Sequence, residues 1–591
     1  MDWGHTKAAD GSTTMSKQQE VEKQEQNENG AICEALDWRG RPATDKHGGP
    51  RTSIFILASQ GLWNVANFAI ATSLVLYFVR VLQMGNATAA NNVTNWIGTQ
   101  FLLTLLGGFL GDAYWGRFKT CAIFQLVHVL GLILLALSAT INALKPPQCN
   151  GPGSMCPSPS ALQVDIFLLG LYITALGTGG YLPAFVAWGA DQFDSEKTRT
   201  TFFGWLFVCQ NIGTIVANTV FVWLQNKGEW ELSFWLATGV GALATLAFGV
   251  GVPTYRQYAP GGNSFVRTAQ VIIASVRKWW IEVPRDADEL HELPTIELIR
   301  QGSRKMPHTP RFRFLDKAAT RVPGEFEKPW KLCNVTQVEE LKCLFRMLPI
   351  WLCAIPFAAV FSQINTLFVE QAAVMDLQLG NIKIPPASLN LVNVMTIFVC
   401  TLLYAPVVVP IARAITGRPT GLTQLQRLGC GQIGVAIAMG LAALVESRRL
   451  SLARQGKQMS VFWLSPQHIV LGISQVFAVV GAMDFFYSEA PHAMKGLVSS
   501  LSLANLAIGS FLSTVLVSIT MHFTTRDGSP GWIPPRNLNV GHVDYFYWLL
   551  MCITLLNVAA FGLGCRWYRR CAPTPESQTN GSHTENVKPY F

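Results

Sequence analysis

The chain has 591 residues, of which 50% are hydrophobic and only 14% are charged, and its mean hydropathy is +0.28. Apolar stretches of about 20 residues, the length that crosses a bilayer as a helix, recur along it. This composition excludes a soluble multidomain protein and predicts a polytopic protein whose partner is the lipid bilayer. The net charge of +9 follows from where the bases lie in loops, so we expect no nucleic-acid partner.

The first part of the chain predicts a polar tail and six helices. Residues 1–52 are polar throughout and predict a disordered cytoplasmic tail. Residues 53–253 form the expected N-terminal half, with helices at about 53–79, 96–110, 121–141, 163–187, 201–224 and 232–252. The short loop after the first helix carries two sequons, which predict glycosylation at Asn86 and Asn92 if the loop faces the lumen during synthesis. In the loop after the third helix, Cys149 and Cys156 fit either a disulfide or two free thiols.

Residues 254–346 interrupt the apolar pattern with a basic linker that contains no spanning segment. Within it, residues 264–281 have an amphipathic pattern that fits a helix lying on the membrane surface. The C-terminal half, 347–568, predicts helices at about 347–371, 385–411, 425–445, 462–486, 497–521 and 544–566, before a cytoplasmic tail at 569–591.

Twelve spans place both tails on the same side of the membrane. With the tails inside, most Lys and Arg residues are cytoplasmic, which agrees with the positive-inside rule. One expected outer loop disagrees, because it carries Arg448, Arg449, Arg454 and Lys457.

The turn between the second and third helices, 108–120, reads Gly-Phe-Leu-Gly-Asp-Ala-Tyr-Trp-Gly-Arg-Phe-Lys-Thr. The spacing Gly-x3-Asp-x3-Gly-Arg-x-Lys resembles a signature of the major facilitator superfamily. The resemblance implies an all-α membrane protein with twelve transmembrane helices in two six-helix halves, and a substrate site near the midplane between them. It also implies that Asp112 and Arg117 form a gating latch that forms and breaks as the transporter changes state.

Other motifs narrow the resemblance to one transporter family. Leu176-Gly-Thr-Gly-Gly-Tyr-Leu-Pro183 and the stretch 203–215 are similar to helices 4 and 5 of the proton-dependent oligopeptide transporter family. Asp37-Trp-Arg-Gly-Arg-Pro and Gly531-Trp-Ile-Pro resemble its plant nitrate/peptide branch. Phe312-Arg-Phe-Leu-Asp-Lys-Ala-Ala and Phe368-Val-Glu-Gln-Ala-Ala resemble the subgroup of the root xylem-loading nitrate transporter.

The chain departs from this family where the family carries charge. Helix 1 of the family usually has Glu-x-x-Glu-Arg/Lys, associated with proton coupling, and here Gln60, Trp63 and Asn64 stand at those positions. The Lys of helix 4 is replaced by Leu182 and the Glu of helix 10 by Gln475. Since that Lys and Glu can pair across the cavity, losing both leaves neither charge stranded. Helix 7 has Phe361 where the nitrate-binding His of the best-known nitrate member would stand.

The expected substrate cavity is therefore polar but uncharged. Amides can donate to an anion or coordinate a small cation without a fixed charge, although some of these groups will bond neighbouring helices instead. Asp484 and Glu370 are expected at helix ends as interfacial charges, and His468 as a solvated imidazole. The cavity residues predicted from the sequence are Gln60, Asn64, Asn67, Asn211, Gln363, Asn365 and Gln475.

The resemblance and these departures predict a secondary-active or facilitative transporter, for nitrate first, working by alternating access with weak or unusual proton coupling. The alternatives are a larger organic solute (a peptide, a plant hormone or a glycoside) and a transport-deficient sensor. Thr120 aligns with a threonine whose phosphorylation switches affinity in a relative, which implies a regulatory kinase as partner; a helix-capping role is the alternative. No nucleophile–base or metal-ligand spacing is present, so we expect no enzyme activity, no cofactor and no metal. We expect the plasma membrane rather than the vacuolar membrane.

Overall fold

The computed structural model describes residues 35–44, 47–145, 159–193, 196–258, 264–300, 303, 305–322, 328–418, 421–491, 494–525, 530–535 and 537–568. Cys149 and Cys156 lie outside the described residues. Within them, twelve helical segments are long and apolar enough to cross a membrane. The prediction of twelve spans is therefore confirmed.

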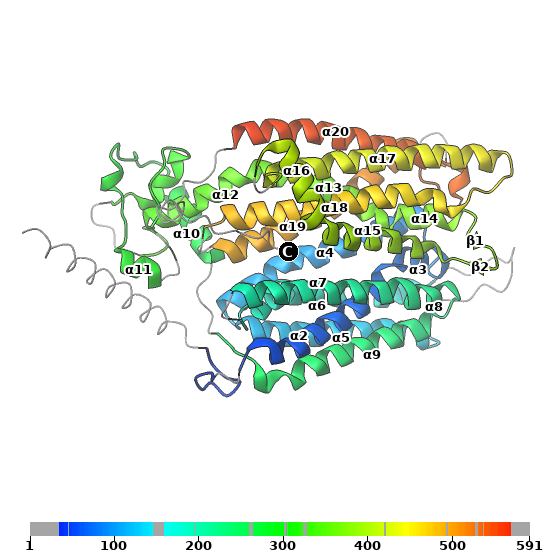
Figure 1. Ribbon diagram of the computed structural model, residues 1–591, viewed down its shortest axis with the longest axis horizontal. Helices are drawn as coiled ribbons and strands as arrows, with labels where there is room; N and C mark the ends of the chain where they lie inside the picture. Colours follow the sequence, from blue (N-terminus) through cyan, green and yellow to red (C-terminus); the bar gives the residue numbers. More distant parts are fainter. Residues whose placement is uncertain are drawn as a thin grey trace, which may run out of the picture.

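In the N-terminal half, drawn in blue to green in Figure 1, the helices lie side by side with their axes roughly aligned. Its first span is broken at Thr72 and Ser73 into α2 and α3. Its fifth span contains a π-helical turn, η1, a distortion that often lies at functional sites. The elements are α2 (Gly49–Ala71), α3 (Leu74–Arg80), α4 (Asn86–Ala113), α5 (Arg117–Thr140), α6 (Ala161–Ala190), α7 (Glu196–Val216), η1 (Ala217–Phe221), α8 (Val222–Asn226) and α9 (Trp230–Val250).

The linker forms a small helical unit at one end of the bundle, which we call the linker end. Its amphipathic helix α10 turns its apolar side toward η4 and the start of α12, and Val271 and Ala274 are fully buried there. Protein therefore covers part of the apolar side of α10, whereas Ile272, Val276 and the following Trp279 and Trp280 are exposed. Contact of residues 264–281 with the membrane surface stays a prediction. The linker elements are η2 (Val252–Thr254), α10 (Ser264–Arg277), η3 (Ala287–Glu289), α11 (Thr295–Arg300) and η4 (Arg313–Ala319).

The C-terminal half is drawn in yellow-green to red in Figure 1. Its short antiparallel hairpin β1–β2 lies at the end of the bundle opposite the linker, and we call this the hairpin end. Its first span is divided into α12, α13, η5 and α14, with Pro356 in the first turn of α13. Its elements are α12 (Val335–Cys353), α13 (Ile355–Phe361), η5 (Ser362–Asn365), α14 (Leu367–Ala373), β1 (Gln378–Leu379), β2 (Ile382–Lys383), η6 (Pro386–Leu389), α15 (Asn390–Leu403), η7 (Tyr404–Val408), α16 (Val409–Thr416), α17 (Gln424–Arg454), η8 (Val461–Leu464), α18 (Ser465–Glu489), α19 (Lys495–Thr524), η11 (Leu538–Val540) and α20 (Val543–Trp567).

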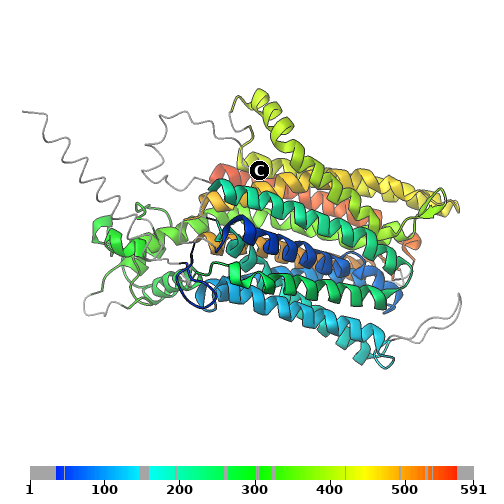
Figure 2. The same cartoon turned by 60° about the horizontal axis from the view of Figure 1, so that its bottom comes forward.

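The two halves meet along α4 and α19, which run side by side between them (Figures 1 and 2). Toward the hairpin end, α14 contacts α3, and α15 contacts α7 and η1. The α4–α19 seam is polar, because Thr94 Oγ1 lies 2.6 Å from Thr514 Oγ1 and Thr514 donates to Asn95 Oδ1 at 2.8 Å. Neutral hydrogen bonds therefore join the halves along this seam.

Glycines on α6 allow three helices of the N-terminal half to pack in close contact. A Cβ atom on Gly180 would lie 2.2 Å from Cγ of Phe124 on α5, and one on Gly179 would lie 2.5 Å from Cβ of Leu103 on α4. Both distances are below any real contact, so the Gly-Thr-Gly-Gly stretch is required by packing.

Two helices are longer than the hydropathy pattern predicts. α4 begins at Asn86, so Asn86 and Asn92 lie in a helix and the expected loop is wrong. Its polar first turns are stable because they pack on α19 and on residues 534–535 rather than facing lipid. α12 begins at Val335, inside the expected linker, because its first three turns pack against η4 and α10.

Candidate functional site

Gln60 on α2 is the most enclosed of the predicted cavity residues. It is fully buried, and the hydroxyl of Tyr181 on α6 donates to its Oε1 at 2.8 Å. Its Nε2 has no hydrogen-bond partner among the described residues. Since an unpaired buried donor costs about 1–3 kcal/mol, this amide is available to a ligand or a water molecule.

Asn64 and Asn211 mainly satisfy the helices around them. The Nδ2 of Asn64 donates to Thr214 Oγ1 at 2.8 Å and to the Gln210 carbonyl at 2.5 Å, which ties α2 to α7. The Nδ2 of Asn211 donates at 2.8 Å to the carbonyl of Phe207 in its own helix. These amides therefore act at least partly as connections between and within helices.

A second polar group in this half surrounds Asn67. Thr178 on α6 donates to Asn67 Oδ1 at 3.3 Å, and its hydroxyl lies 3.3 Å from Nδ1 of the buried His128. The His128 ring lies 5.6 Å from that of Trp63, which occupies a position where the family usually has an acid. His128 was not predicted from the sequence as part of this polar group; the available signal was a lone histidine in the apolar run of α5.

In the C-terminal half, the three predicted cavity residues lie on two elements. Gln363 in η5 donates from Nε2 to Ser513 Oγ at 2.9 Å, while its Oε1 has no partner among the described residues. Gln475 on α18 accepts from Asn393 Nδ2 at 3.4 Å. Asn365 ends η5 and is half-buried. The hydrogen bonds described here for the predicted cavity residues stay within their own halves.

Glu370 on α14 corrects the expectation of an interfacial charge at a helix end. Its side chain is buried, and neither carboxylate oxygen has a hydrogen-bond partner among the described residues. His468 is also buried rather than solvated, with its ring edge-on to Phe368 at 5.4 Å. Asp484 pairs with Arg427, with Nη2 2.7 Å from its carboxylate. Glu370 is thus a buried acid whose carboxylate forms no hydrogen bond with any described residue.

Arg449 does not belong to an outer loop, because α17 continues to Arg454. Arg449 is buried and bonds Glu446 through Nε and Nη2, each at 2.7 Å. Gln371, the neighbour of Glu370, donates to the same Glu446 carboxylate at 2.7 Å. This explains part of the disagreement with the positive-inside rule. The i,i+3 spacing of acid and base in continued helical register was the available signal.

Arg117 at the start of α5 contacts two acids. Its Nε lies 3.0 Å from Asp112 Oδ1, as the signature implies, and its Nη1 lies 2.8 Å from Asp191 Oδ2 at the end of α6. These partly exposed ion pairs connect the linker ends of α4, α5 and α6. Asp191, which lies between the family-like stretches 176–183 and 203–215, was not predicted from the sequence as a partner of Arg117.

The proposed modification sites lie in ordered surroundings. Thr120 is fully buried and donates to the Gly116 carbonyl at 2.9 Å, so a kinase would need this first turn of α5 to open. The Asn86 amide is buried and donates to the Pro534 carbonyl at 3.0 Å, so a glycan there is incompatible with this contact. Asn92 is half-buried, with its Nδ2 3.3 Å from the Met84 sulfur. Phosphorylation and glycosylation stay predictions.

Comparison with known proteins agrees with this architecture. The sequence model of the POT family matches residues 118–533. The chain is 40% identical to the NRT1/PTR FAMILY 8.3 protein of Arabidopsis thaliana, covering 91% of this chain and 94% of the relative, and 38% identical to NRT1/PTR FAMILY 7.3 of the same plant, covering 94% and 93%. An auto-inhibited POT family peptide transporter of known structure has a TM-score of 0.65 at 18% identity, over 89% of this chain and 99% of the other. Because the chain is similarly identical to the NRT1/PTR FAMILY 8.3 and 7.3 proteins, these identities do not assign it to one subgroup of the family.

Proposed function

The chain belongs to the POT family of membrane transporters, and from this premise we propose that it carries a small anion, nitrate first, by alternating access between its two halves. The observation that carries the proposal is the uncharged interior at Gln60. Where relatives have a charged triad, this chain has a buried amide whose N–H donor finds no partner in the described part of the structure. A monovalent, planar anion can be held by such donors without a fixed countercharge.

A second candidate is a larger organic solute. Solved POT transporters in complex with a thioalcohol-conjugated peptide and with 5-aminolevulinic acid share the fold at TM-scores of 0.60. A peptide is a zwitterion, however, and its two ends need opposite charges in the cavity. Gln60, Leu182 and Gln475 supply none, so the interior favours a singly charged or neutral solute. A sensor that no longer transports is the third reading.

Proton coupling, if the cycle uses it, must act through a group other than the helix 1 triad. Glu370 fits this role best, because it is a buried carboxyl on α14, next to Gln371, with both oxygens unpartnered in the described structure. A carboxyl in such a place is costly when ionised and stable when protonated. Coupling through one isolated acid is the weak coupling that we propose.

Uptake of ¹⁵N-nitrate in oocytes, normalised to surface abundance, tests the substrate. We expect uptake above that of water-injected cells, and a KM raised roughly tenfold in Gln60→Leu, since a hydrogen bond to a charged group contributes about 1.5 kcal/mol or more. Gln455→Leu, at an exposed position after α17, is the matched control and should leave KM unchanged. Uptake of a labelled dipeptide without nitrate uptake would support the second candidate, and no uptake of either at normal surface abundance would support the sensor.

We also propose residence in the plasma membrane rather than the vacuolar membrane. Nitrate that passes from one cell to another must cross the plasma membrane, so this location follows from the proposed substrate. A fluorescent fusion expressed in plant protoplasts, imaged with a vacuolar-membrane marker, distinguishes the two locations.

A further inference from the structure

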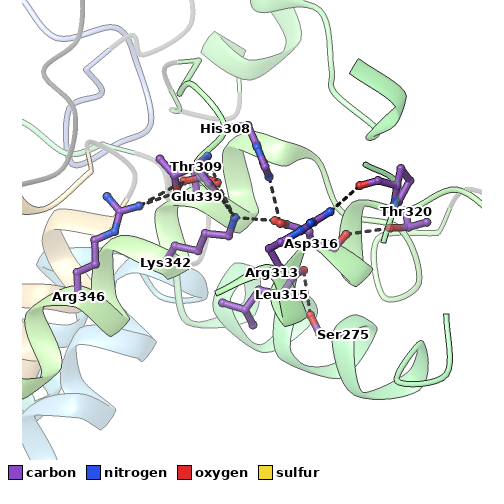
Figure 3. A network of polar contacts seen from close by, with 11 residues as sticks. Ser275, His308, Thr309, Arg313, Leu315, Asp316, Thr320, Glu339, Lys342 and Arg346 are labelled. Carbon is purple, nitrogen blue, oxygen red and sulfur yellow. Dashed lines mark hydrogen bonds and ion pairs between the residues drawn. The ribbon is translucent and has the colours of Figure 1, made fainter. Parts of the chain in front are cut away.

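The linker is fastened to α12 by a buried network of charges (Figure 3). The ammonium of Lys342, which is fully buried, lies 2.6 Å from Asp316 Oδ1 of η4 and 2.8 Å from Glu339 Oε1 of α12. His308 contacts the other oxygen of Asp316 at 3.0 Å. We call this group, Asp316, Glu339, Lys342, Arg346, His308 and Thr309, the linker dock.

The linker dock is not a metal site, although three potential ligands gather in it. His308, Asp316 and Glu339 place ligand atoms within 4.8 Å of one another. The Lys342 ammonium, however, lies against both carboxylates and already neutralises them. With Arg346 at the edge, two acids face two bases, so the charges of the dock balance while His308 is neutral.

Thr309 occupies the edge of this balanced group. Its hydroxyl donates to Glu339 Oε2 at 2.7 Å and accepts from Arg346 Nη2 at 2.6 Å. Its N–H donates to Glu339 Oε1 at 3.0 Å, and its carbonyl accepts from Lys342 at 2.8 Å. One residue of the linker thus contacts an acid and two bases of α12 through all of its polar groups.

The segment that carries Thr309 is suited to being bound by another protein. Residues 305–309 have no helix or strand, and the next residue, Pro310, is exposed. Thr309 itself is half-buried, on a loop at the linker end, where we expect the cytoplasm. The dipeptide Thr309-Pro310 is the pattern that proline-directed serine/threonine kinases recognise, and Thr120, by contrast, is fully buried in a helix.

We propose that Thr309 is a phosphorylation site, and that its phosphate opens the linker dock. A kinase would transfer the γ-phosphoryl group of ATP to Thr309. The bond from the threonine oxygen to phosphorus forms, the bond from phosphorus to the β,γ-bridging oxygen breaks, the hydroxyl proton passes to the catalytic base of the kinase, and ADP leaves. This inference depends on the linker facing the cytoplasm and is independent of which solute is carried.

The consequence follows from charge. A phosphate adds about −1.5 to −2 charge at pH 7 beside Glu339, which is only 1% exposed. Arg346 and Lys342 can turn to the phosphate, but Glu339 and Asp316 then lose the bases that neutralise them. A balanced buried group becomes anionic, and ion pairs broken in this way are strongly destabilising. We therefore expect residues 305–311 to leave α12.

Opening of the dock would be transmitted to both halves. α12 continues through α13 and η5 to α14, so the dock is attached to the first span of the C-terminal half. The linker also touches the N-terminal half, because the Phe265 ring of α10 lies 5.9 Å from that of Phe109 on α4. A docked linker therefore connects the two halves at the linker end, and its release should ease their relative movement and raise the maximal transport rate.

The site itself is tested by treating the purified full chain in detergent with ATP and a proline-directed kinase, followed by phosphopeptide mass spectrometry. Thr574-Pro575 in the C-terminal tail has the same pattern and serves as an internal control for kinase activity. We expect phosphate on Thr309, its loss in Thr309→Ala and its retention in Thr309→Ser. Phosphate on Thr574 with none on Thr309 would overturn the proposal.

Cys333 reports whether the dock opens. It is 2% exposed within the linker core, and burial raises the pKa of its thiol to about 12, so it should react slowly with maleimide. We expect phosphorylation, or Thr309→Glu, to accelerate its alkylation at least fivefold, measured on the Cys333 peptide. Thr309→Val, which removes the hydroxyl without adding charge, is the matched control. Unchanged alkylation in chains with phosphate on Thr309 would contradict the opening.

Discussion

The guanidinium of Arg117 lies 2.8 Å from the carboxylate of Asp191 and 3.0 Å from that of Asp112. All three residues belong to the N-terminal half, so Arg117 connects the linker ends of α4, α5 and α6 to one another. The contacts of Arg117 therefore lie inside one half. The latch role that the signature implies for Asp112 and Arg117 stays a prediction.

Charge reversal at Asp112 should abolish transport. In Asp112→Lys a second cation replaces one partner of Arg117, and Asp191 alone must neutralise both. We expect less than about a tenth of parental flux at near-normal surface abundance, because partly exposed ion pairs contribute little to global stability. Flux per surface molecule in oocytes measures this, with Lys119→Asp in the same turn, at an exposed position, as the control. Parental flux in Asp112→Lys would show that the latch is not needed.

The spans themselves follow from sequence because they depend on hydropathy. What the hydropathy could not show is where polar residues continue a helix. Asn86 extends α4, and Glu446 and Arg449 extend α17, because partners from distant parts of the chain, such as Gln371 for Glu446, bond to them. Contacts over 448 residues, such as that of Asn86 with Pro534, leave no local pattern.

The sequence predicted that the candidate site would be polar and uncharged, but it predicted only part of how its residues are bonded and buried. The departures at Gln60, Trp63 and Asn64 could be read directly from a family motif, and they define the uncharged interior. The motif did not indicate that Asn64 would be bonded to α7, or that Glu370 would be buried with no hydrogen-bond partner among the described residues. Both depend on how neighbouring helices rotate, which is decided by packing such as that around Gly180.

A disulfide across the α4–α19 seam should stop transport. The hydroxyl oxygens of Thr94 and Thr514 lie 2.6 Å apart, so we expect cysteines at both positions to form a disulfide that holds the halves together. We expect oxidised Thr94→Cys/Thr514→Cys to lose flux and dithiothreitol to restore it. The two single-cysteine variants and the oxidant-treated parent should keep their flux. Normal flux in molecules shown by mass spectrometry to be cross-linked would mean that the halves do not separate here.

Adding one methyl group to α6 should disrupt the N-terminal half. In Gly180→Ala the new Cβ would lie 2.2 Å from the Phe124 ring, so the helices must move apart. Overpacking of this kind costs about 1–3 kcal/mol, which should lower the Tm in detergent by several degrees. Gly239→Ala on α9, where a Cβ meets nothing within 4 Å, is the matched control and should keep or slightly raise the Tm. Equal Tm values for the two variants would contradict the close packing.

Transport should depend less on pH than in relatives that keep the charged triad. Gln60, Trp63 and Asn64 do not titrate, and neither do Leu182 and Gln475, so solute binding to this interior needs no proton. We expect flux at external pH of about 5.5 and about 7.5, with the membrane potential clamped, to differ less than twofold and to run down the electrochemical gradient of the solute. Restoring Glu at 60 and 63 and Arg at 64 together should not restore coupling, because positions 182 and 475 would still lack their charges.

A steep rise at acid pH, with inward current against an outward solute gradient, would show that another group carries the proton. Glu370→Gln should then abolish that rise, whereas Asp484→Asn, at a carboxylate already paired with Arg427, should preserve it.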